Sequence, residues 1–510
     1  MKRLLLPLAF FLYFNALFTF ENIPSTPAMR LVPKLSVEIL LLIALLAAVK
    51  KLPPVARGLL AGLIFVATLV RYVDVTALGV LGRSFDLYGD FPHLHRVLAM
   101  FWEVMTPGLA LLVLSVAAVG ASVAVTLNWI GLGVLNRELP RYASAVALGV
   151  FVIPHSLRSE PVSVIVARQL GNLGTVASPE FASIEVETQR LDSNLYGLGS
   201  ANVFLIFLES YGVTLLEDAH HFEAIAPRFE ALEKHLSEAG YSFSSSQIQS
   251  PTFGGGSWRA HASLLSGFQA ENEHLYNSLL ASERKTLVHV MKARGYRTVA
   301  AEPGIKWYWP DGLFYGFDRI YDFDALDYQG PSMGWWKIPD QFTLYRIYKN
   351  EVAAAEGPLF AKFSLIMTHI PYYPVPPYVA DWTRFDDGTA FQSGLASVAH
   401  DAYRDLMELS RWYVDAFRYE IDCLEGFLID YVPENSLVII VGDHQPPKLA
   451  THDNDSWAVP MHVLSKREDL VRAFDSLGFE PGLVPLRPSS LRMADFLEGF
   501  LDIYDVREAD

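Results

Sequence analysis

The sequence predicts an N-terminal region of about five membrane-spanning helices, followed by an α/β domain with a mostly parallel central sheet. Three observations predict this fold class. Apolar segments of helical length fill residues 1–160, and short apolar runs alternate with helical patterns in the rest of the chain. The charge divides at the same place. Residues 1–160 hold 13 Lys and Arg against 8 Asp and Glu, a net charge of +5, and the remaining 27 against 48 give residues 161–510 a net charge of −21.

Each predicted span supplies most of the roughly 20 apolar residues that a membrane-crossing helix needs. The five segments are Leu4–Phe20, Leu35–Val49, Gly58 to about Leu81, Val104–Asn136 and Tyr142–Ser156. Cations are densest in the loops that would face the cytoplasm if the N-terminus does. Five spans then place the α/β domain outside a bacterial-type cytoplasmic (inner) membrane, as part of a multi-pass protein. Splitting Val104–Asn136 into two spans would reverse this orientation.

Composition excludes several classes of protein. A domain with a net charge of −21 argues against nucleic acid as the main partner, because phosphate binding needs clustered cations. The single cysteine, Cys423, excludes an intrachain disulfide framework and a metal site built from several thiolates. We therefore expect three regions: a transmembrane region over 1–160, a linker over 161–200 and an extracytoplasmic globular domain over 201–510.

The globular domain opens with NVFLIFLES, a continuous apolar run typical of a buried parallel strand. Helical patterns separate this run from the later strand candidates, and such alternation predicts a sheet with helices on both faces. The other predicted strands are Arg297–Ala301, Phe360–Thr368, Leu437–Val441 and Met461–Leu464. The predicted helices are about Ala224–Ala239, Trp258–Leu265, Thr286–Arg294, Tyr403–Tyr431, Arg467–Leu477 and Leu491–Phe500.

Polar side chains follow three of these strands, and ligands bind at the carboxyl ends of strands in such sheets. Glu209 follows the first strand, the pair Asp443 and His444 follows Leu437–Val441, and His369 ends the run at Phe360–Thr368. Each also has a purely structural explanation. Glu209 could be a solvated strand end, Asp443 and His444 could form a turn before a proline, and His369 could be a buried structural histidine. Three strands ending in metal-binding groups together favour a divalent metal site of oxygen and imidazole ligands.

A glycine-rich loop precedes one of the predicted helices. Three glycines, 254–256, are followed at once by Ser257 and then by apolar residues at helical spacing. A serine at a helix N-terminus lies where free N–H groups and the helix dipole favour an anion, such as a phosphate or a serine alkoxide. The alternative is that Ser257 only caps the helix. The segment lacks the Gly-x-Ser-x-Gly pattern of a lipase-type nucleophile.

In this order, the motifs resemble the alkaline phosphatase/sulfatase superfamily. The similarity is greatest to its membrane-bound branch of lipoteichoic acid synthases and phosphoglycerol and phosphoethanolamine transferases. FLES with Glu209, VIIVGDH with Asp443 and His444, and THIPYYP with His369 match family segments. GWWKIPDQF and RGYRT resemble two more. Ser257 stands where the family carries Thr, less often Ser.

The resemblance implies a site and a reaction. Glu209, Ser257, Asp443 and His444 would hold one divalent ion, Mn²⁺ or Zn²⁺, with Mg²⁺ a further candidate. Ser257 would attack the phosphodiester of a membrane phospholipid donor and form a covalent ester. A hydroxyl of a glycan or lipid acceptor would then take the phosphoglycerol or phosphoethanolamine group. His369 would stabilise the phosphate or protonate a leaving oxygen.

The chain departs from the family after RGYRT. Glu302 stands where some relatives have histidine, and KWYWPDG replaces a Trp-x-Arg segment. We expect Glu302, Trp307 and Trp309 as candidate substrate contacts, although the two tryptophans also fit a buried aromatic cluster.

Two further readings stay open. One is a phosphodiesterase or sulfuric ester hydrolase of the same superfamily, and the other is a non-catalytic membrane scaffold. Sulfatases carry a C/S-x-P-x-R pattern, which SWRAH at Ser257 lacks. This absence counts against sulfate esters.

Overall fold

A computed structural model divides the chain into two compact units, Met1–Phe181 and Ala182–Asp510. The predicted fifth span, Tyr142–Ser156, lies outside the residues that the structure describes. The described residues are 2–23, 29–49, 51–138, 159–176, 191, 193–385, 387–392, 409–451, 454–485 and 490–505.

The first unit is helical, and two of its described helices, α3 (Pro54–Leu81) and α6 (Pro107–Glu138), are long and apolar enough to cross a membrane. The helices α1 (Lys2–Thr19) and α2 (Val37–Ala48) contribute shorter apolar stretches. The prediction of five spans is therefore supported for only two. Of the predicted span Val104–Asn136, the part from Pro107 onward lies in one continuous long helix, α6, so the split that would reverse the orientation is not seen.

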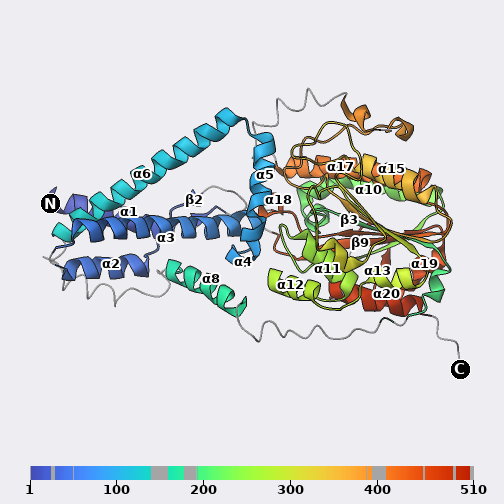
Figure 1. The fold of residues 1–510 in the computed structure, drawn as a ribbon, viewed down its shortest axis with the longest axis horizontal. Helices are drawn as coiled ribbons and strands as arrows, with labels where there is room; N and C mark the ends of the chain where they lie inside the picture. Colours follow the sequence, from blue (N-terminus) through green and yellow to red (C-terminus); the bar gives the residue numbers. More distant parts are fainter. Residues whose placement is uncertain are drawn as a thin grey trace. The chain divides into compact units, whose positions relative to one another are not determined.

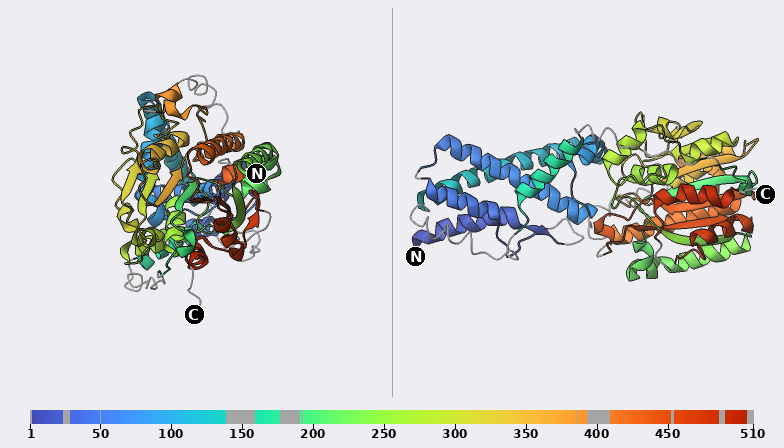
Figure 2. Two further views of the ribbon diagram at one scale, coloured as in Figure 1. Left: turned by 90° about the vertical axis from the view of Figure 1, so that its right-hand side faces the viewer. Right: turned by 90° about the horizontal axis from the view of Figure 1, so that it is seen from below.

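Part of the expected linker is also helical, as α8 (Val162–Val176) of the first unit. In Figure 2 the blue to teal helices lie side by side, with α3 packed against α6 and α8, and α1 and α2 against α6. The remaining elements of this unit are α4 (Leu87–Asp90), η1 (Phe91–His93), α5 (Leu94–Val104), and the short paired strands β1 (Glu21–Asn22) and β2 (Met29–Arg30).

Several buried polar groups in these helices have partners inside the unit. The amide of Asn128 on α6 donates to the carbonyl oxygen of Ala61 on α3 at 3.2 Å. Arg71 and Asp74, which interrupt the apolar pattern of α3, are both buried, and Asp74 forms an ion pair with Arg168 on α8 at 3.0 Å. A lipid environment offers no hydrogen bonds, so polar groups on such helices must be satisfied by one another.

The second unit is built on an eight-stranded sheet with the order β10-β4-β9-β8-β3-β7-β5-β6. β3 pairs in parallel with β7 and β8, and β5 pairs in parallel with β7 and β6. β9 is antiparallel to both β8 and β4, and β10 is antiparallel to β4, so only β9 and β10 run against the rest. The prediction of a mostly parallel sheet is confirmed. The strands are β3 (Asn202–Leu208), β4 (Ser242–Gln249), β5 (Arg297–Glu302), β6 (Arg319–Asp322), β7 (Leu359–Leu365), β8 (Ser436–Gly442), β9 (Ala458–Ser465) and β10 (Glu480–Pro481).

The sequence pattern missed β4, although this strand lies well inside the sheet. Its sequence, SFSSSQIQ, has no apolar run, yet most of its side chains are buried. One reason is the hydroxyl of Ser245, which lies 2.7 Å from Nδ1 of His462 on the neighbouring strand β9. Hydrogen bonding between strands thus replaces the hydrophobic pattern that predicts a buried strand.

Helices cover both faces of the sheet, as Figure 1 shows. The helices α10 (Ala219–Glu238), α15 (Asp340–Ile347) and α17 (Leu409–Asp430) pack on one face. On the other face lie α11 (Ser257–Ser266), α13 (Leu287–Ala293), α19 (Glu468–Arg472) and α20 (Phe496–Tyr504). The shorter segments are η5 (Tyr196–Leu198), α9 (Thr214–Glu217), α12 (Glu273–Ala281), α14 (Gly312–Tyr315), η6 (Tyr348–Val352), η7 (Trp382–Arg384), η8 (Thr389–Gln392), α18 (Lys448–Thr451), η10 (Ala473–Leu477) and η11 (Met493–Asp495).

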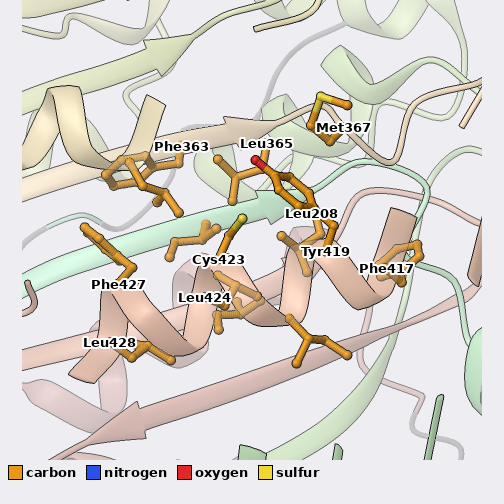
Figure 3. Close-up of a cluster of buried hydrophobic side chains, with 14 of the residues drawn as sticks. Leu208, Phe363, Leu365, Met367, Phe417, Tyr419, Cys423, Leu424, Phe427 and Leu428 are labelled. Carbon is orange, nitrogen blue, oxygen red and sulfur yellow. The ribbon is translucent and has the colours of Figure 1, made fainter. Parts of the chain in front are cut away.

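The core under α17 is shown in Figure 3. Phe427 and Cys423 of this helix point toward Leu208 of β3 and Phe363 of β7, and all four side chains are buried. The lone cysteine is therefore a small core residue in this structure. This packing holds α17 against the two strands whose carboxyl ends carry Glu209 and His369.

We expect position 442, at the end of β8, to tolerate no side chain, because the backbone of Tyr211 lies too close. A Cβ added at Gly442 would lie 1.8 Å from the carbonyl oxygen of Tyr211, so Gly442→Ala should lower the free energy of unfolding by about 1–3 kcal/mol. Gly357→Ala is the matched control, because no atom lies within 4 Å of its added Cβ. Urea unfolding of the detergent-solubilised chain, followed by tryptophan fluorescence, compares the two variants. Equal losses would contradict the steric explanation.

Candidate active site

The ends of three adjacent strands bring the predicted site together. β3 lies between β7 and β8, and Leu208 at its end pairs in register with Gly442 at the end of β8. The backbone N–H of Asp443 donates to the carbonyl oxygen of Leu208 at 3.3 Å, and that of Glu209 donates to Leu365 at the end of β7 at 3.1 Å. Glu209 and Asp443 therefore leave the same edge of the sheet side by side.

The glycine loop places Ser257 at the first position of α11, with Gly256 as the N-cap. All three glycines have positive φ, namely 65°, 140° and 86°, which side chains other than glycine rarely adopt. Gly256 has a second reason to be glycine, because its Cβ would lie 2.7 Å from Nη2 of Arg259. The guanidinium of Arg259 donates to the Thr252 hydroxyl at 2.6 Å, and this hydrogen bond fixes the start of the glycine loop to α11.

The hydroxyl of Ser257 is not used to cap the helix, so the capping interpretation is wrong. Ser257 Oγ instead donates to Glu209 Oε2 at 2.8 Å and lies 3.2 Å from His444 Nε2. His444 Nε2 lies 3.4 Å from Glu209 Oε1 and 3.6 Å from Asp443 Oδ2. The ligand atoms of Glu209, Asp443 and His444 all lie within 4.8 Å of one another.

The chemistry of this cluster fits a divalent cation. Nδ1 of His444 lies 2.8 Å from the carbonyl oxygen of Gln445 and must donate to it, so the lone pair of Nε2 faces the two carboxylates. Burial lowers the pKa of His444, which keeps its ring in the neutral, metal-binding form. Burial and the neighbouring Glu209 raise the pKa of Asp443, because like charges repel in a buried site. A cation between these groups would remove that repulsion.

One oxygen of Asp443 has a structural task. Its Oδ1 accepts hydrogen bonds from the backbone N–H of Ser210 at 2.8 Å and of His444 at 2.6 Å. These bonds orient the carboxylate so that Oδ2 faces His444. Ser210 also donates its hydroxyl to Glu209 Oε1 at 3.0 Å and has a φ of 58°, a strained value for serine. Sequence reasoning missed Ser210, although it directly follows Glu209.

His369 stands beside this cluster. The hydroxyl of Thr368, the residue before it, donates to the carbonyl oxygen of Glu209 at 2.6 Å. Burial alone would raise the pKa of Glu209, but the nearby His444 and His369 lower it. Among the described residues His369 shows no hydrogen bond to Glu209; its Nδ1 lies 2.6 Å from the carbonyl oxygen of Ile370. The structure thus brings His369 near the predicted ligands without joining it to them.

The segment GWWKIPDQF holds the loop that carries His369. Lys337 is fully buried, and its ammonium donates to the carbonyl oxygen of His369 at 3.2 Å. The carboxylate of Asp340 accepts the backbone N–H groups of Ile366 at 2.9 Å and Met367 at 2.6 Å. Sequence reasoning missed Lys337, although a lysine within an aromatic, apolar segment is a signal of a buried charge.

Glu302 lies at the end of β5 and is only 6% exposed. Its carboxylate pairs with Lys362 and accepts the hydroxyl of Ser364 at 2.8 Å. Both partners come from β7, where Lys362 interrupts an otherwise apolar run. A direct substrate contact by Glu302 stays a prediction, but both of its oxygens already have protein partners.

The two tryptophans expected as substrate contacts differ in exposure and in packing. Trp307 is 47% exposed and meets the ring of Trp336 edge-on at 5.0 Å between centroids. Trp336 in turn contacts Trp335, whose ring lies 5.2 Å from that of His369. Trp309 is partly buried, packs against the hydrophobic core and contacts the ring of Tyr315, which agrees in part with the aromatic-cluster interpretation. Of the two, only Trp307 belongs to a run of rings that reaches His369.

The buried ammonium of Lys337 predicts a pH effect on stability. Burial lowers its pKa to about 7, although Asp340 and Glu209 act in the opposite direction. Above pH 7 and up to the ordinary lysine value of about 10.4, the unfolded chain binds a proton that the folded chain lacks. Stability therefore rises with pH in this window, by at most about 1.4 kcal/mol per pH unit.

Lys337→Met should make that rise smaller than in the wild-type protein. Urea unfolding at about pH 7.5 and about pH 9 measures it. Lys285→Met, at an exposed lysine, is the control and should keep the wild-type pH dependence. An unchanged pH dependence in Lys337→Met would sink this account of Lys337.

Comparisons with known proteins bear on the family. A sequence profile of the sulfatase family matches residues 201–466. No curated protein matches the sequence.

Three similar solved structures are transferases or synthases by name, and their likeness concerns the fold alone. The integral membrane lipooligosaccharide phosphoethanolamine transferase A of Neisseria meningitidis is 14% identical, with 92% of this chain and 87% of that chain covered and a TM-score of 0.49. The lipoteichoic acid synthase LtaP of Listeria monocytogenes is 12% identical, with 65% and 78% covered and a TM-score of 0.41. The phosphoglycerol transferase GacH of Streptococcus pyogenes is 12% identical, with 67% and 91% covered and a TM-score of 0.37. Because the sulfatase profile spans more than half of the 510 residues, the chain belongs to the sulfatase family, within the superfamily that its motifs resemble.

Proposed function

We propose that the chain is a metal-dependent membrane phosphotransferase. It moves a phosphoglycerol or phosphoethanolamine group from a membrane phospholipid, through a covalent Ser257 ester, to a hydroxyl of an envelope glycan or lipid. One observation carries the proposal: the Ser257 hydroxyl lies at the start of α11, 2.8 Å from Glu209 and 3.2 Å from His444. This is the arrangement of a nucleophile beside a proton acceptor and a metal-binding group.

Glu209, Asp443, His444 and Ser257 are the residues that would hold the ion. When bound, a divalent ion lowers the pKa of a coordinated hydroxyl and neutralises phosphate charge. Mn²⁺ or Zn²⁺ suits two carboxylates and an imidazole, and Mg²⁺ is a further candidate.

The chain's own residues then account for the two transfer steps. Ser257 gives its proton to Glu209, its oxygen bonds to phosphorus, and the bond from phosphorus to the diacylglycerol oxygen breaks. The first N–H groups of α11 stabilise the negative phosphate oxygens. His369 protonates the leaving oxygen and later takes the proton of the acceptor hydroxyl, whose oxygen displaces the Ser257 oxygen from phosphorus while Glu209 returns its proton to Ser257.

A lipid donor agrees with the apolar helices of the first unit. Two described helices, α3 and α6, are long and apolar enough to cross a membrane. Such helices would keep a catalytic domain close to phospholipid headgroups, and the charge distribution of the sequence favours the extracytoplasmic side of a bacterial-type cytoplasmic membrane.

Hydrolysis is the second candidate, and membership of the sulfatase family favours it. Water would then replace the acceptor hydroxyl in the second step. The sulfate-ester form of this candidate is the weaker one, because the C/S-x-P-x-R pattern is missing at Ser257. The scaffold alternative is opposed by the geometry of Glu209, Asp443 and His444, which keeps a complete set of metal-binding groups.

Intact-protein mass spectrometry tests the covalent step. The detergent-solubilised chain is incubated with phosphatidylglycerol or phosphatidylethanolamine and Mn²⁺ or Zn²⁺. We expect a mass increase equal to phosphoglycerol or phosphoethanolamine, and its loss in Ser257→Ala. Ser266→Ala is the matched control on the same helix, because its hydroxyl donates to the carbonyl oxygen of Ala262 within that helix.

Each result has a meaning. An adduct that survives in Ser257→Ala would exclude Ser257 as the nucleophile. Metal-dependent headgroup release without an adduct would favour the hydrolase. Neither adduct nor release from either lipid would contradict the proposed donors.

Metal binding is tested apart from turnover. Mn²⁺ or Zn²⁺ is expected to raise the thermal midpoint of the wild-type chain, because a ligand that binds only the folded state stabilises it. Asp443→Asn should lose most of this increase, whereas Asp475→Asn, in η10 and away from the site, should keep it. An equal increase in both variants would contradict Asp443 as a ligand.

A further inference from the structure

A second polar cluster lies next to Ser257 and has no place in the mechanism above. It joins His261 of α11, Lys362 and Ser364 of β7, and Glu302 of β5. Lys362 is only 2% exposed. Burying an ammonium and a carboxylate carries a large desolvation cost, and buried ion pairs of this kind stabilise a fold little, if at all.

The hydrogen bonds of Lys362 determine where the proton of His261 lies. The ammonium has three N–H groups and three partners: Glu302 Oε1, Ser364 Oγ at 2.6 Å and His261 Nδ1 at 3.2 Å. Because the ammonium only donates, Nδ1 accepts, and the neutral ring carries its proton on Nε2. Burial, together with the charge of Lys362, holds the pKa of His261 well below its usual range, which keeps the ring neutral.

The Nε2–H of His261 is a buried hydrogen-bond donor that the described part of the chain leaves unsatisfied. A buried donor of this kind costs free energy unless something accepts its hydrogen bond. The ring itself is held in place, since it packs against Phe207 of β3 with 4.0 Å between ring centroids.

His261 lies one helical turn after the nucleophile on α11. His261 follows Ser257 by four residues, so both lie on one face of the helix. Helical side chains lean toward the N-terminus, so we expect the ring of His261 to lie toward the turn that begins at Ser257. Burial lowers the pKa of both His261 and Lys362; His444 adds to this shift at His261, and Asp443 opposes it at Lys362, so the cluster lies within electrostatic reach of the metal-binding groups.

We propose that His261 is a further substrate-binding residue. Its Nε2–H donates a hydrogen bond to a phosphate oxygen of the group held at Ser257, and Lys362 and Glu302 are positioning residues that keep the proton on Nε2. This inference rests on the proposed function, because it requires a phosphate group at Ser257. It also gives Glu302 a different task from the substrate contact expected from the sequence.

Two variants of His261 separate the donor from the packing. His261→Gln keeps an N–H group near the position of Nε2, and His261→Leu fills similar space without a donor. With Zn²⁺ present, isothermal titration with inorganic phosphate is expected to show about 10-fold or greater weakening in His261→Leu and nearly wild-type affinity in His261→Gln. Headgroup release from phosphatidylglycerol or phosphatidylethanolamine should fall roughly 10- to 100-fold in His261→Leu only.

A mutant cycle tests the positioning role. The double variant Glu302→Gln, Lys362→Met removes both charges together and leaves neither buried alone. It should weaken phosphate binding, and adding His261→Leu should weaken it little further, because the donor is then already misplaced. Independent, additive losses would show a structural role only and would overturn the positioning of His261.

The outcomes distinguish this inference from the proposed function. Wild-type phosphate affinity in His261→Leu, or equal losses in His261→Leu and His261→Gln, would overturn the inference even if both lipids are turned over. Failure of wild type to bind inorganic phosphate would overturn it too. Failure to use either lipid, with phosphate binding that depends on the His261 donor, would instead contradict only the proposed donors. Zn²⁺-induced stabilisation should be the same in both His261 variants, which excludes damage to the metal-binding groups.

Discussion

The parallel pairing of β3 with β8 is the constraint on which the rest of the site depends. It sets Leu208 opposite Gly442, so that Glu209 and Asp443 emerge beside each other. Gly442 permits the approach, since the carbonyl oxygen of Tyr211 occupies the space of a side chain. Once this register is formed, the backbone N–H of Ser210 orients the Asp443 carboxylate, and the glycine loop brings Ser257 to Glu209.

Charged groups surround this edge of the sheet at an unusual depth. Lys337 supports the loop of His369, and Lys362 binds Glu302 beneath α11. Both lysines are buried, and isolated buried charges are costly. Each one, however, is tied to a residue near Ser257 by a described hydrogen bond. We explain the two buried lysines by the orientation they give to site residues. A gain in stability explains them less well, because proteins in which apolar residues replace a buried ion pair are often just as stable.

The predictability of the site differs from residue to residue. Glu209, Asp443 and His444 follow strongly apolar runs, and such runs are readable because parallel strands are buried on both faces. Ser257 was found from the glycines before it. The sequence did not predict the roles of Lys337, Lys362 and His261. Their hydrogen-bond partners are distant in the sequence, and no local sequence pattern indicates such a bond. The strand β4 was missed for a similar reason, since its serines are buried through contacts with β9.

The sequence alone determined the class of the second unit, the positions of its main strands along the chain and the residue types at their ends. These follow from local hydrophobic runs, which reflect burial directly. Only the tertiary structure decided that Ser257 bonds to Glu209 instead of capping its helix and that Glu302 pairs with Lys362. It also decided that one nitrogen of His261 finds no hydrogen-bond partner among the described residues. Those facts depend on distances of a few ångströms between separate strands and helices, and a hydrogen bond exists only when the fold has closed that distance.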